Sequence, residues 1–227
     1  MRKIAIVLLF SLPLFAGFFP QTVHTSISKV TSENTVILKQ SFPLNGMTGV
    51  IVHRYSDELK AITSRLVQTS PARAKLLKGA IIHHEALPTI NTAVKVGDKV
   101  IGGYLYHNVL LLAPDAQSYA KVTSQYSKNW IHPDLFAIFL AKEGDNIPTK
   151  ENLEKFAKAY QVGLVAIITQ GKLKLLDPIS GSTISQKSMG GLPTKGQAPF
   201  YMRFDEIDSG LFSSKNTQSY YQIMKNL

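Results

Sequence analysis

Three short stretches of this sequence hold residue types that could carry out chemistry. The first is His83-His84-Glu85, which follows an apolar run and offers imidazole and carboxylate groups, ligands that zinc accepts. In an extended strand alternate side chains face opposite sides, so His84 points away from His83 and Glu85. A zinc protease would need two histidines four residues apart on a helix, with an intervening glutamate. We therefore interpret the stretch as a polar strand end and expect no metal site.

The second stretch, Ser118-Tyr-Ala-Lys121, matches the serine-x-x-lysine pattern of penicillin-binding enzymes. Ser214-Lys-Asn216 only loosely resembles their second motif, and the third motif, Lys-Thr-Gly, is missing from the sequence. Ser26-Ile-Ser-Lys29 repeats the first pattern by accident in a polar segment. Because the pattern recurs so readily, we interpret Ser118 as an ordinary residue of an amphipathic helix.

The third candidate is the carboxylate pair Glu143 and Asp145, which could serve acid–base catalysis. Its place in a glycine-containing loop after a helix favours solvated turn residues instead. The sequence has no Gly-x-Ser-x-Gly elbow, phosphate-binding loop or dinucleotide fingerprint. It has no cysteine either, which excludes disulfides, thiol catalysis and cysteine metal sites. We expect no catalytic residue, no metal and no cofactor, and hence a protein that is not an enzyme.

The first residues of the chain indicate where in the cell the protein is located. Arg2 and Lys3 precede an apolar run, residues 4–19, that is short for a membrane-spanning helix. A basic start, an apolar stretch and small residues near Gly17 are typical of a secretory signal. We predict a signal peptide at residues 1–17 that engages the secretion machinery, and export to the periplasm or outer surface of a bacterial envelope. An uncleaved anchor is the alternative, because the sequence has no clean small-x-small cleavage site.

The charge of the chain favours acidic partners. The formal net charge is +10, and loss of Arg2 and Lys3 with the signal leaves +8. Such a charge attracts anionic lipid, polyanionic envelope polymers or acidic proteins. Nucleic acid is not an expected partner, because the basic residues are scattered and the chain is exported. One denser group is interpreted as a solvated face: Arg65, Arg73, Lys75 and Lys78.

The pattern of apolar residues predicts an α+β fold with two halves. Residues 18–34 are polar and rich in Ser and Thr, which indicates a linker. Residues 35–113 hold short β-branched runs, among them a hairpin around residues 55–58, and predict a strand-rich, barrel-like half. Within this half, strands are expected at 75–84, 93–96 and 104–112, with a sharp bend at Gly102-Gly103.

From residue 114 the spacing of the apolar residues changes from a period of two to one of 3.6 residues. This change predicts an α/β unit of helices followed by a strand and hairpin over residues 114–190. Asp115 and Thr149 are expected to cap helices, and Pro133 to begin one whose inward face includes Leu135. Gly163 is expected to stop the third helix. Residues 191–227 are Gly/Pro-rich and then polar, which predicts a tail that includes a short terminal helix at residues 219–224.

Four stretches carry a family resemblance: "GMTGVIVHRY", "ALPTINTAVKVGDKVIGGYLYHNVLLLAPD", "HPDLFAIFLAKEGDNIPTKENLEKF" and "VGLVAIITQGKLKLLD". Their anchors are Gly97-Asp98, the run from His132 to Phe136, Pro148-Thr149 and Val162-Gly163-Leu164. In order and spacing they resemble the N-terminal domain of the bacterial surface plasminogen-binding protein family. The resemblance runs from about Lys39 to Asp177.

The resemblance implies an exported, non-enzymatic envelope protein that acts as a binding or scaffolding domain and recruits host plasminogen. Plasminogen's kringle modules hold a lysine through its ammonium and a free carboxylate, in an aromatic-lined trough. The candidate lysines are Lys225, Lys215 and Lys187. Lys225 is not the terminal residue of the given sequence, and the family's binding is associated with a long lysine-rich extension. We therefore also expect that the shared domain could serve as an envelope scaffold.

Two other functions stay open at this point. The first is an envelope hydrolase that acts on peptidoglycan or peptide through His53, His84 or His107. Clustering of these histidines with a carboxylate in one cleft would favour it, and dispersal would count against it. The second is binding of anionic lipid or polymer through the +8 charge of the exported chain, which would be strongly sensitive to salt.

Overall fold

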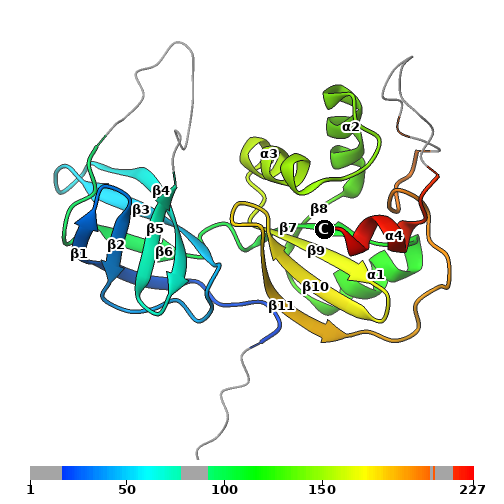
Figure 1. Cartoon of the computed structure of the whole chain (residues 1–227), viewed down its shortest axis with the longest axis horizontal. Coiled ribbons are helices and arrows are strands. Elements are labelled where there is room, and N and C mark those ends of the chain that lie inside the picture. Colours follow the sequence, from blue (N-terminus) through cyan, green and yellow to red (C-terminus); the bar gives the residue numbers. More distant parts are fainter. Residues whose placement is uncertain (1–16, 78–91, 205–206, 208–216) are drawn as a thin grey trace, which may run out of the picture.

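A computed structural model describes residues 17–77, 92–204, 207 and 217–227 of the chain. Two lobes lie side by side along its longest axis (Figure 1). The first lobe is a closed antiparallel barrel, and the second is a five-stranded mixed sheet with helices. This arrangement confirms the predicted α+β fold, with a barrel-like half followed by an α/β unit. None of the described helices is both long and apolar enough to cross a membrane.

The barrel strands pair in the order β1-β2-β5-β4-β3-β6, and β6 pairs back with β1 to close the sheet. They are β1 (Val23–Ser32), β2 (Thr35–Leu38), β3 (Thr48–Arg54), β4 (Lys60–Ser70), β5 (Arg73–Leu77) and β6 (Lys99–Gly102). Closure pairs both sheet edges, which would otherwise be open to other chains. Apolar side chains from the barrel segments form the core: Ile27, Val36, Leu38, Phe42, Met47, Ile51, Leu66, Ala74 and Val100.

The predicted hairpin around residues 55–58 is confirmed by the pairing of β3 with β4. The predicted linker at residues 18–34 is wrong where β1 lies, because this segment pairs with both β2 and β6. Ile27 is the one fully buried residue of β1, and its neighbours are Ser, Thr, Lys and other residues that are largely exposed. A strand with so few inward side chains has almost no apolar pattern, so its composition resembles that of a loop.

The barrel ends earlier than residue 113. The strand expected at 93–96 is irregular chain, and the strand expected from Tyr104 begins only at Asn108. The cause is a turn at Gly103, whose φ of 67° is open to glycine but strained for other residues. This turn, at the expected bend, ends the barrel sheet and leads into a strand of the second sheet. The strand expected at 75–84 is confirmed as far as Leu77, and its remainder lies outside the described residues.

The second lobe follows an α/β pattern. Its strands lie in the order β11-β10-β9-β7-β8, with β7 parallel to both β8 and β9. The strands are β7 (Asn108–Leu112), β8 (Asn129–Ile131), β9 (Leu164–Thr169), β10 (Lys172–Asp177) and β11 (Ser182–Ser188). The helices are α1 (Ala116–Gln125), α2 (Pro133–Glu143), α3 (Lys150–Tyr160) and α4 (Tyr220–Lys225). The strand β8 has only three residues and was not expected from the sequence.

Both faces of this sheet are covered, which explains why residues 109–112 of β7 and 164–168 of β9 are all apolar. Alternate residues such as Leu111 and Ala166 face α1 and belong to the same apolar cluster as the barrel core. The others, such as Leu112 and Ile167, pack against α2, α3 and α4. The barrel and one face of the sheet therefore share a continuous apolar core.

The helix starts agree with the sequence. Asp115 and Thr149 accept capping hydrogen bonds, and Pro133 is the first residue of α2. Two details differ. Leu135 does not point inward but is 44% exposed, because Phe136 and Leu140 occupy the inward face of α2. The third helix is stopped by Gln161 in a left-handed conformation, with φ of 54°, and not by Gly163.

The predicted tail is not a polar appendage. Phe200, Met202, Ile223 and Met224 are buried in the core against α2 and α3. The hydroxyl of Tyr220 donates to the backbone carbonyls of β7 and β9, at 3.0 and 2.6 Å. The expected terminal helix is present as α4. The tail prediction failed because these apolar residues are widely spaced in a polar segment.

Gly163 has a packing role that yields a prediction. It enters β9 beside the chain that joins the lobes, and a Cβ at this position would overlap the carbonyl of Leu105. Because both partners are backbone, neither can move aside as a side-chain tip would. We predict that Gly163→Ala lowers the free energy of unfolding by about 1–3 kcal/mol, measured by urea denaturation.

The matched control is Gly190→Ala, since a Cβ there meets nothing within 4 Å. This variant should stay within about 0.5 kcal/mol of the parent chain. Equal unfolding midpoints for the two variants would contradict the packing role of Gly163.

Candidate functional site

A buried carboxylate joins the two lobes. Asp177 is the last residue of β10 and is fully buried. Its Oδ2 atom accepts hydrogen bonds from the backbone N–H and hydroxyl of Thr48, at 3.1 and 2.6 Å, and from the Tyr106 hydroxyl at 2.7 Å. Its Oδ1 atom accepts from the N–H groups of Ile179 and Ser180, at 2.9 and 3.1 Å. Donors from the barrel, the connection and the second sheet therefore meet on one side chain.

Burial shifts the pKa values of this group. It raises the pKa of Asp177 above its ordinary value, while the hydrogen bonds from Thr48, Tyr106 and Ser180 oppose the rise. Burial, with the neighbouring carboxylate, also raises the pKa of Tyr106, so its phenol stays a donor. A carboxyl whose pKa is higher in the folded than in the unfolded chain stabilises the fold at low pH, and this contribution is lost as the pH rises through the folded pKa. Above that pKa the side chain of Asp177 is ionised, and the hydrogen bonds that it accepts offset the cost of burying its charge.

A second set of contacts fixes the barrel loop that reaches the sheet. The hydroxyl of Ser180 donates to the carbonyl of Gly46 at 2.7 Å. Behind this loop, the buried side chain of Gln68 accepts from the N–H of Phe42 at 2.7 Å and donates to the Phe42 carbonyl at 3.1 Å. The loop before β3 is thus held from both sides, next to Thr48.

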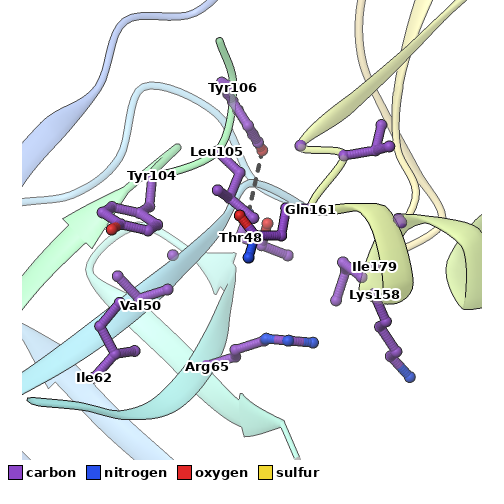
Figure 2. Close-up of a pocket in the computed structure, with 14 residues that line it drawn as sticks. Thr48, Val50, Ile62, Arg65, Tyr104, Leu105, Tyr106, Lys158, Gln161 and Ile179 are labelled. Atoms are coloured by element: carbon purple, nitrogen blue, oxygen red, sulfur yellow. Dashed lines mark hydrogen bonds between the residues drawn. The ribbon is translucent and has the colours of Figure 1, made fainter. Parts of the chain in front are cut away.

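Beside the junction lies a cleft with a volume of about 210 Å³. Val50, Ile62 and Arg65 line it from the barrel, whereas Leu105 lines it from the connection and Lys158 from α3. Figure 2 shows the Arg65 side chain extending from β4 toward the helix that carries Lys158. The cleft therefore has apolar walls and a cationic side chain on each side.

The interpretation of Arg65 as part of a solvated face is wrong. Arg65 pairs with Val50 across β3 and β4, and both line the cleft against the second lobe. Its guanidinium is partly buried, and this burial lowers its pKa. Arg73 and Lys75 are exposed, as expected, and Lys78 lies outside the described residues. Strand pairing and lobe packing, which the local sequence does not encode, distinguish Arg65 from its neighbours.

The three candidate lysines are not equivalent. Lys225 is exposed on the last turn of α4. The ammonium of Lys187 donates to the hydroxyl of Tyr126 and lies 4.7 Å from the centre of that ring and 5.2 Å from that of Phe18. It is therefore already engaged within the protein. Lys215 lies outside the described residues.

The two described histidine candidates, His53 and His107, lie far apart. The Nδ1 atom of His53 lies 2.6 Å from a carboxylate oxygen of Asp98, a pair that could form part of a catalytic triad. A nucleophilic hydroxyl on the other ring nitrogen is not found among the described residues. His107 is exposed in the turn after β6, at the opposite end of the barrel strands. His84, with the rest of His83-His84-Glu85, lies outside the described residues.

The other catalytic candidates have structural partners. Ser118 is buried and its N–H donates to the cap Asp115 at 2.7 Å, while Lys121 donates to the carbonyl of Gly190 at 2.8 Å. Glu143 pairs with Lys155, and Asp145 accepts from the amide of Asn152. The residues 214–216 lie outside the described part. Within that part, His, Asp and Glu side chains form no group of three that could hold a metal ion.

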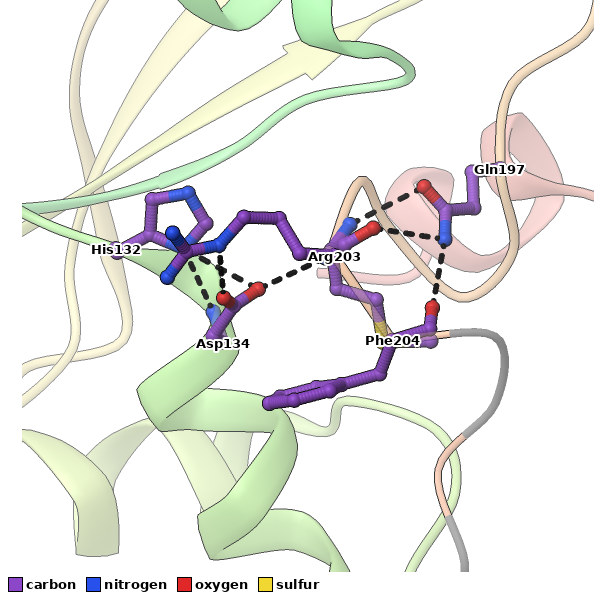
Figure 3. Close-up of polar contacts among 6 residues, drawn as sticks. His132, Asp134, Gln197, Arg203 and Phe204 are labelled. Atoms are coloured by element: carbon purple, nitrogen blue, oxygen red, sulfur yellow. Dashed lines mark hydrogen bonds and ion pairs between the residues drawn. The ribbon is translucent and has the colours of Figure 1, made fainter.

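A polar cluster fastens the tail to α2 (Figure 3). Asp134, at the start of α2, accepts from the backbone N–H of Arg203 at 3.0 Å and from its guanidinium at 2.6 Å. Burial alone would raise the pKa of Asp134, but Arg203 and the neighbouring His132 hold it below its ordinary value. A lowered pKa contributes stability that is present at neutral pH and lost as the pH falls through the folded pKa. The cluster therefore acts as a structural clasp.

Fold and site together define a two-lobed α+β protein whose candidate site is a binding cleft and whose described catalytic candidates are dispersed. The profile of the family described as "Plasminogen-binding protein pgbA N-terminal" matches residues 22–227. The chain therefore belongs to this family. The match confirms the resemblance and extends it beyond residues 39–177, to both ends of the folded region.

Two relatives are similar over the same region. The plasminogen-binding protein PgbA of Helicobacter pylori strain J99 / ATCC 700824 is 26% identical over 230 residues, and that of strain ATCC 700392 / 26695 is also 26% identical over 230 residues. Each alignment covers 96% of this chain and 50% of the relative. The chain thus spans half the length of these relatives. No solved structure matches it.

The junction predicts a graded response to substitution of Asp177. Asp177→Ala removes both acceptor oxygens, leaves the backbone N–H groups of Ile179 and Ser180 without a partner, and should lower the free energy of unfolding by about 3 kcal/mol or more. Asp177→Asn keeps one oxygen, and the hydroxyls of Thr48 and Tyr106 can turn to accept from its amide. The backbone N–H of Thr48 loses Oδ2 as an acceptor but keeps the Tyr106 hydroxyl oxygen, at 3.2 Å. It should lose only about 1–2 kcal/mol. Urea denaturation at pH 7 measures both.

The control is Asp57→Asn, because the Asp57 side chain is 92% exposed and should change stability by less than about 0.5 kcal/mol. Equal losses for the Ala and Asn variants of Asp177 would show that its acceptor atoms are not what stabilises the junction.

Proposed function

We propose that the chain is an exported, non-enzymatic protein of the bacterial envelope whose two-lobed domain binds host plasminogen. The observation that carries this proposal is the family match over residues 22–227, which includes both lobes and the terminal helix. The names of the two relatives state plasminogen binding for proteins that align with nearly the whole chain. Because half of each relative lies outside the alignment, this activity is a proposal for the present chain.

Export is supported by the predicted signal at residues 1–17, and the folded lobe begins with the two residues after it. The rings of Phe18 and Phe19 pack against Tyr126, at centroid distances of 5.8 and 5.0 Å, and Phe19 also meets Trp130 at 6.2 Å. These two residues are therefore part of the folded lobe. Cleavage after Ala16 or Gly17 would leave that packing intact, so the folded lobe is compatible with a cleaved signal.

A binding role is favoured over hydrolysis by the arrangement of the histidines. His53 is engaged with Asp98 at one end of the barrel, and His107 lies at the other end. A hydrolase would need its base, nucleophile and oxyanion donors within hydrogen-bond reach of one substrate. The described candidates are separated instead, and each has a local structural role.

Among the candidate lysines, Lys225 is best placed to meet a kringle. It projects from the exposed side of α4, while its neighbours Ile223 and Met224 anchor the helix in the core. A firmly anchored helix presents the ammonium at little entropic cost. Lys187 is disfavoured because Phe18 and Tyr126 surround its ammonium.

The test is binding of the purified chain to immobilised plasminogen, with and without 6-aminohexanoate as a free lysine analogue, and at about 0.05 and 0.3 M salt. We expect saturable binding that the analogue blocks and that Lys225→Ala weakens by about tenfold or more. Lys172→Ala is the matched control, because Lys172 is exposed at the start of β10 and on a different element.

Two outcomes would contradict the proposal. Binding that ignores the analogue and disappears at the higher salt concentration would be charge attraction, in line with the net charge of +8 that remains after loss of Arg2 and Lys3. Failure to bind at either salt concentration would leave the domain as an envelope scaffold.

A further inference from the structure

We propose that the cleft between the lobes binds a small ligand that carries one carboxylate on a short apolar group. The ligand chemistry is shared by a peptide C-terminus with an apolar last residue and by a free short-chain carboxylic acid. Lys225 does not line this cleft, so ligand binding here can be tested independently of plasminogen binding.

The charge of the cleft favours a single negative group. Its lining includes Arg65 and Lys158, and none of the described residues that line it is acidic. Because Lys158 already pairs with Glu154 at 2.6 Å, the two cations leave at most one uncompensated positive charge. A guanidinium has five N–H donors in a fork that fits a carboxylate, and it can accept a ligand while it keeps another partner. A monoanion therefore suits the cleft better than a dianion.

The burial of Arg65 adds to this argument. Partial loss of water lowers the pKa of its guanidinium, which means that the charge is less well solvated than on the open surface. A bound carboxylate would add a charge-assisted hydrogen bond to this guanidinium, beside the partner that it already has. Arg73 and Lys75, on the neighbouring strand, are exposed to water and do not line the cleft.

The walls and size of the cleft favour a short apolar group. Val50, Ile62, Leu105 and Ile179 supply aliphatic surface around the guanidinium. The volume of about 210 Å³ is smaller than the roughly 300–1,000 Å³ of sites for drug-sized molecules. It therefore suits one or two side chains, or a short acyl chain, and is too small for a lipid with two long chains.

The cleft is also formed before any ligand binds. One wall is tied to the other through Thr48 and Tyr106, which both donate to Asp177. On the other side, Gly163 packs directly on the backbone of Leu105. A site with fixed walls loses little conformational entropy on binding, so even a small ligand can bind measurably.

The test is an amide-detected NMR titration of the full chain with octanoate and N-acetyl-L-leucine, each compared with its neutral amide. We expect saturable shifts at cleft residues for both acids, and about tenfold weaker binding of the amides. Arg65→Gln should weaken binding of the acids by about tenfold, whereas Arg73→Gln should leave it unchanged. Lys158→Glu, on the exposed side of α3, should weaken the acids but not the amides, and it tests the proposal even if Arg65→Gln unfolds.

The relative affinities identify the source of the carboxylate. Tighter binding of N-acetyl-L-leucine indicates a peptide end and tighter binding of octanoate indicates a free acid, and either order supports the proposal. Equal binding of acids and amides, shifts confined to residues outside the cleft, or no saturation up to about 10 mM would overturn it. Octyl phosphate that binds more than about tenfold tighter than octanoate would overturn the assignment of a monoanion.

Discussion

A buried carboxylate can be tolerated only where hydrogen-bond donors replace the water that it has lost, and this requirement places the two lobes of the protein. Removing the donors of an ionised carboxylate would cost several kcal/mol, so Asp177 at the end of β10 needs Thr48 from the barrel and Tyr106 from the connection. These partners are far apart in the sequence. The polar junction lies beside a continuous apolar cluster, in which Met47 of the barrel and Ile184 of β11 both take part. The hydrogen bonds to Asp177 and the burial of the apolar side chains therefore require the same placement of the two lobes.

The same constraint produces the cleft. Because the barrel is held against the α/β unit near Thr48, the neighbouring Val50 and Arg65 face the end of α3 instead of solvent. The cleft thus exists as a consequence of lobe placement, and it combines a guanidinium with apolar walls. Lys225 on α4 belongs to another part of the molecule, anchored through Met224 and Tyr220. The domain consequently offers two separate features for binding, one on its surface and one between its lobes.

Much of the fold could be predicted from the sequence, where local patterns are strong. Helix caps such as Thr149 and the hairpin between β3 and β4 follow from short-range chemistry. The strand β1 could not be recognised, because Ile27 is its single fully buried residue, and its pairing with the distant strand β6 leaves no signal in the local sequence. Arg65 could not be told apart from the exposed Arg73 and Lys75, because the packing of the lobes that buries it is not visible in the local sequence. Asp177 ends an apolar strand immediately before a proline, which indicated a turn but not five long-range and local donors. Side-chain roles set by lobe packing leave no local pattern to detect.

The most direct test of this account is hydrogen exchange of the backbone amides of Thr48, Ile179 and Ser180, which all donate to Asp177. If the junction holds the lobes together in the folded state, these amides should exchange only with global unfolding, at the rate of core amides in β9. Exchange as rapid as that of the exposed turn at residues 55–58 would mean that the junction opens while each lobe stays folded. That result would contradict the central role assigned to Asp177.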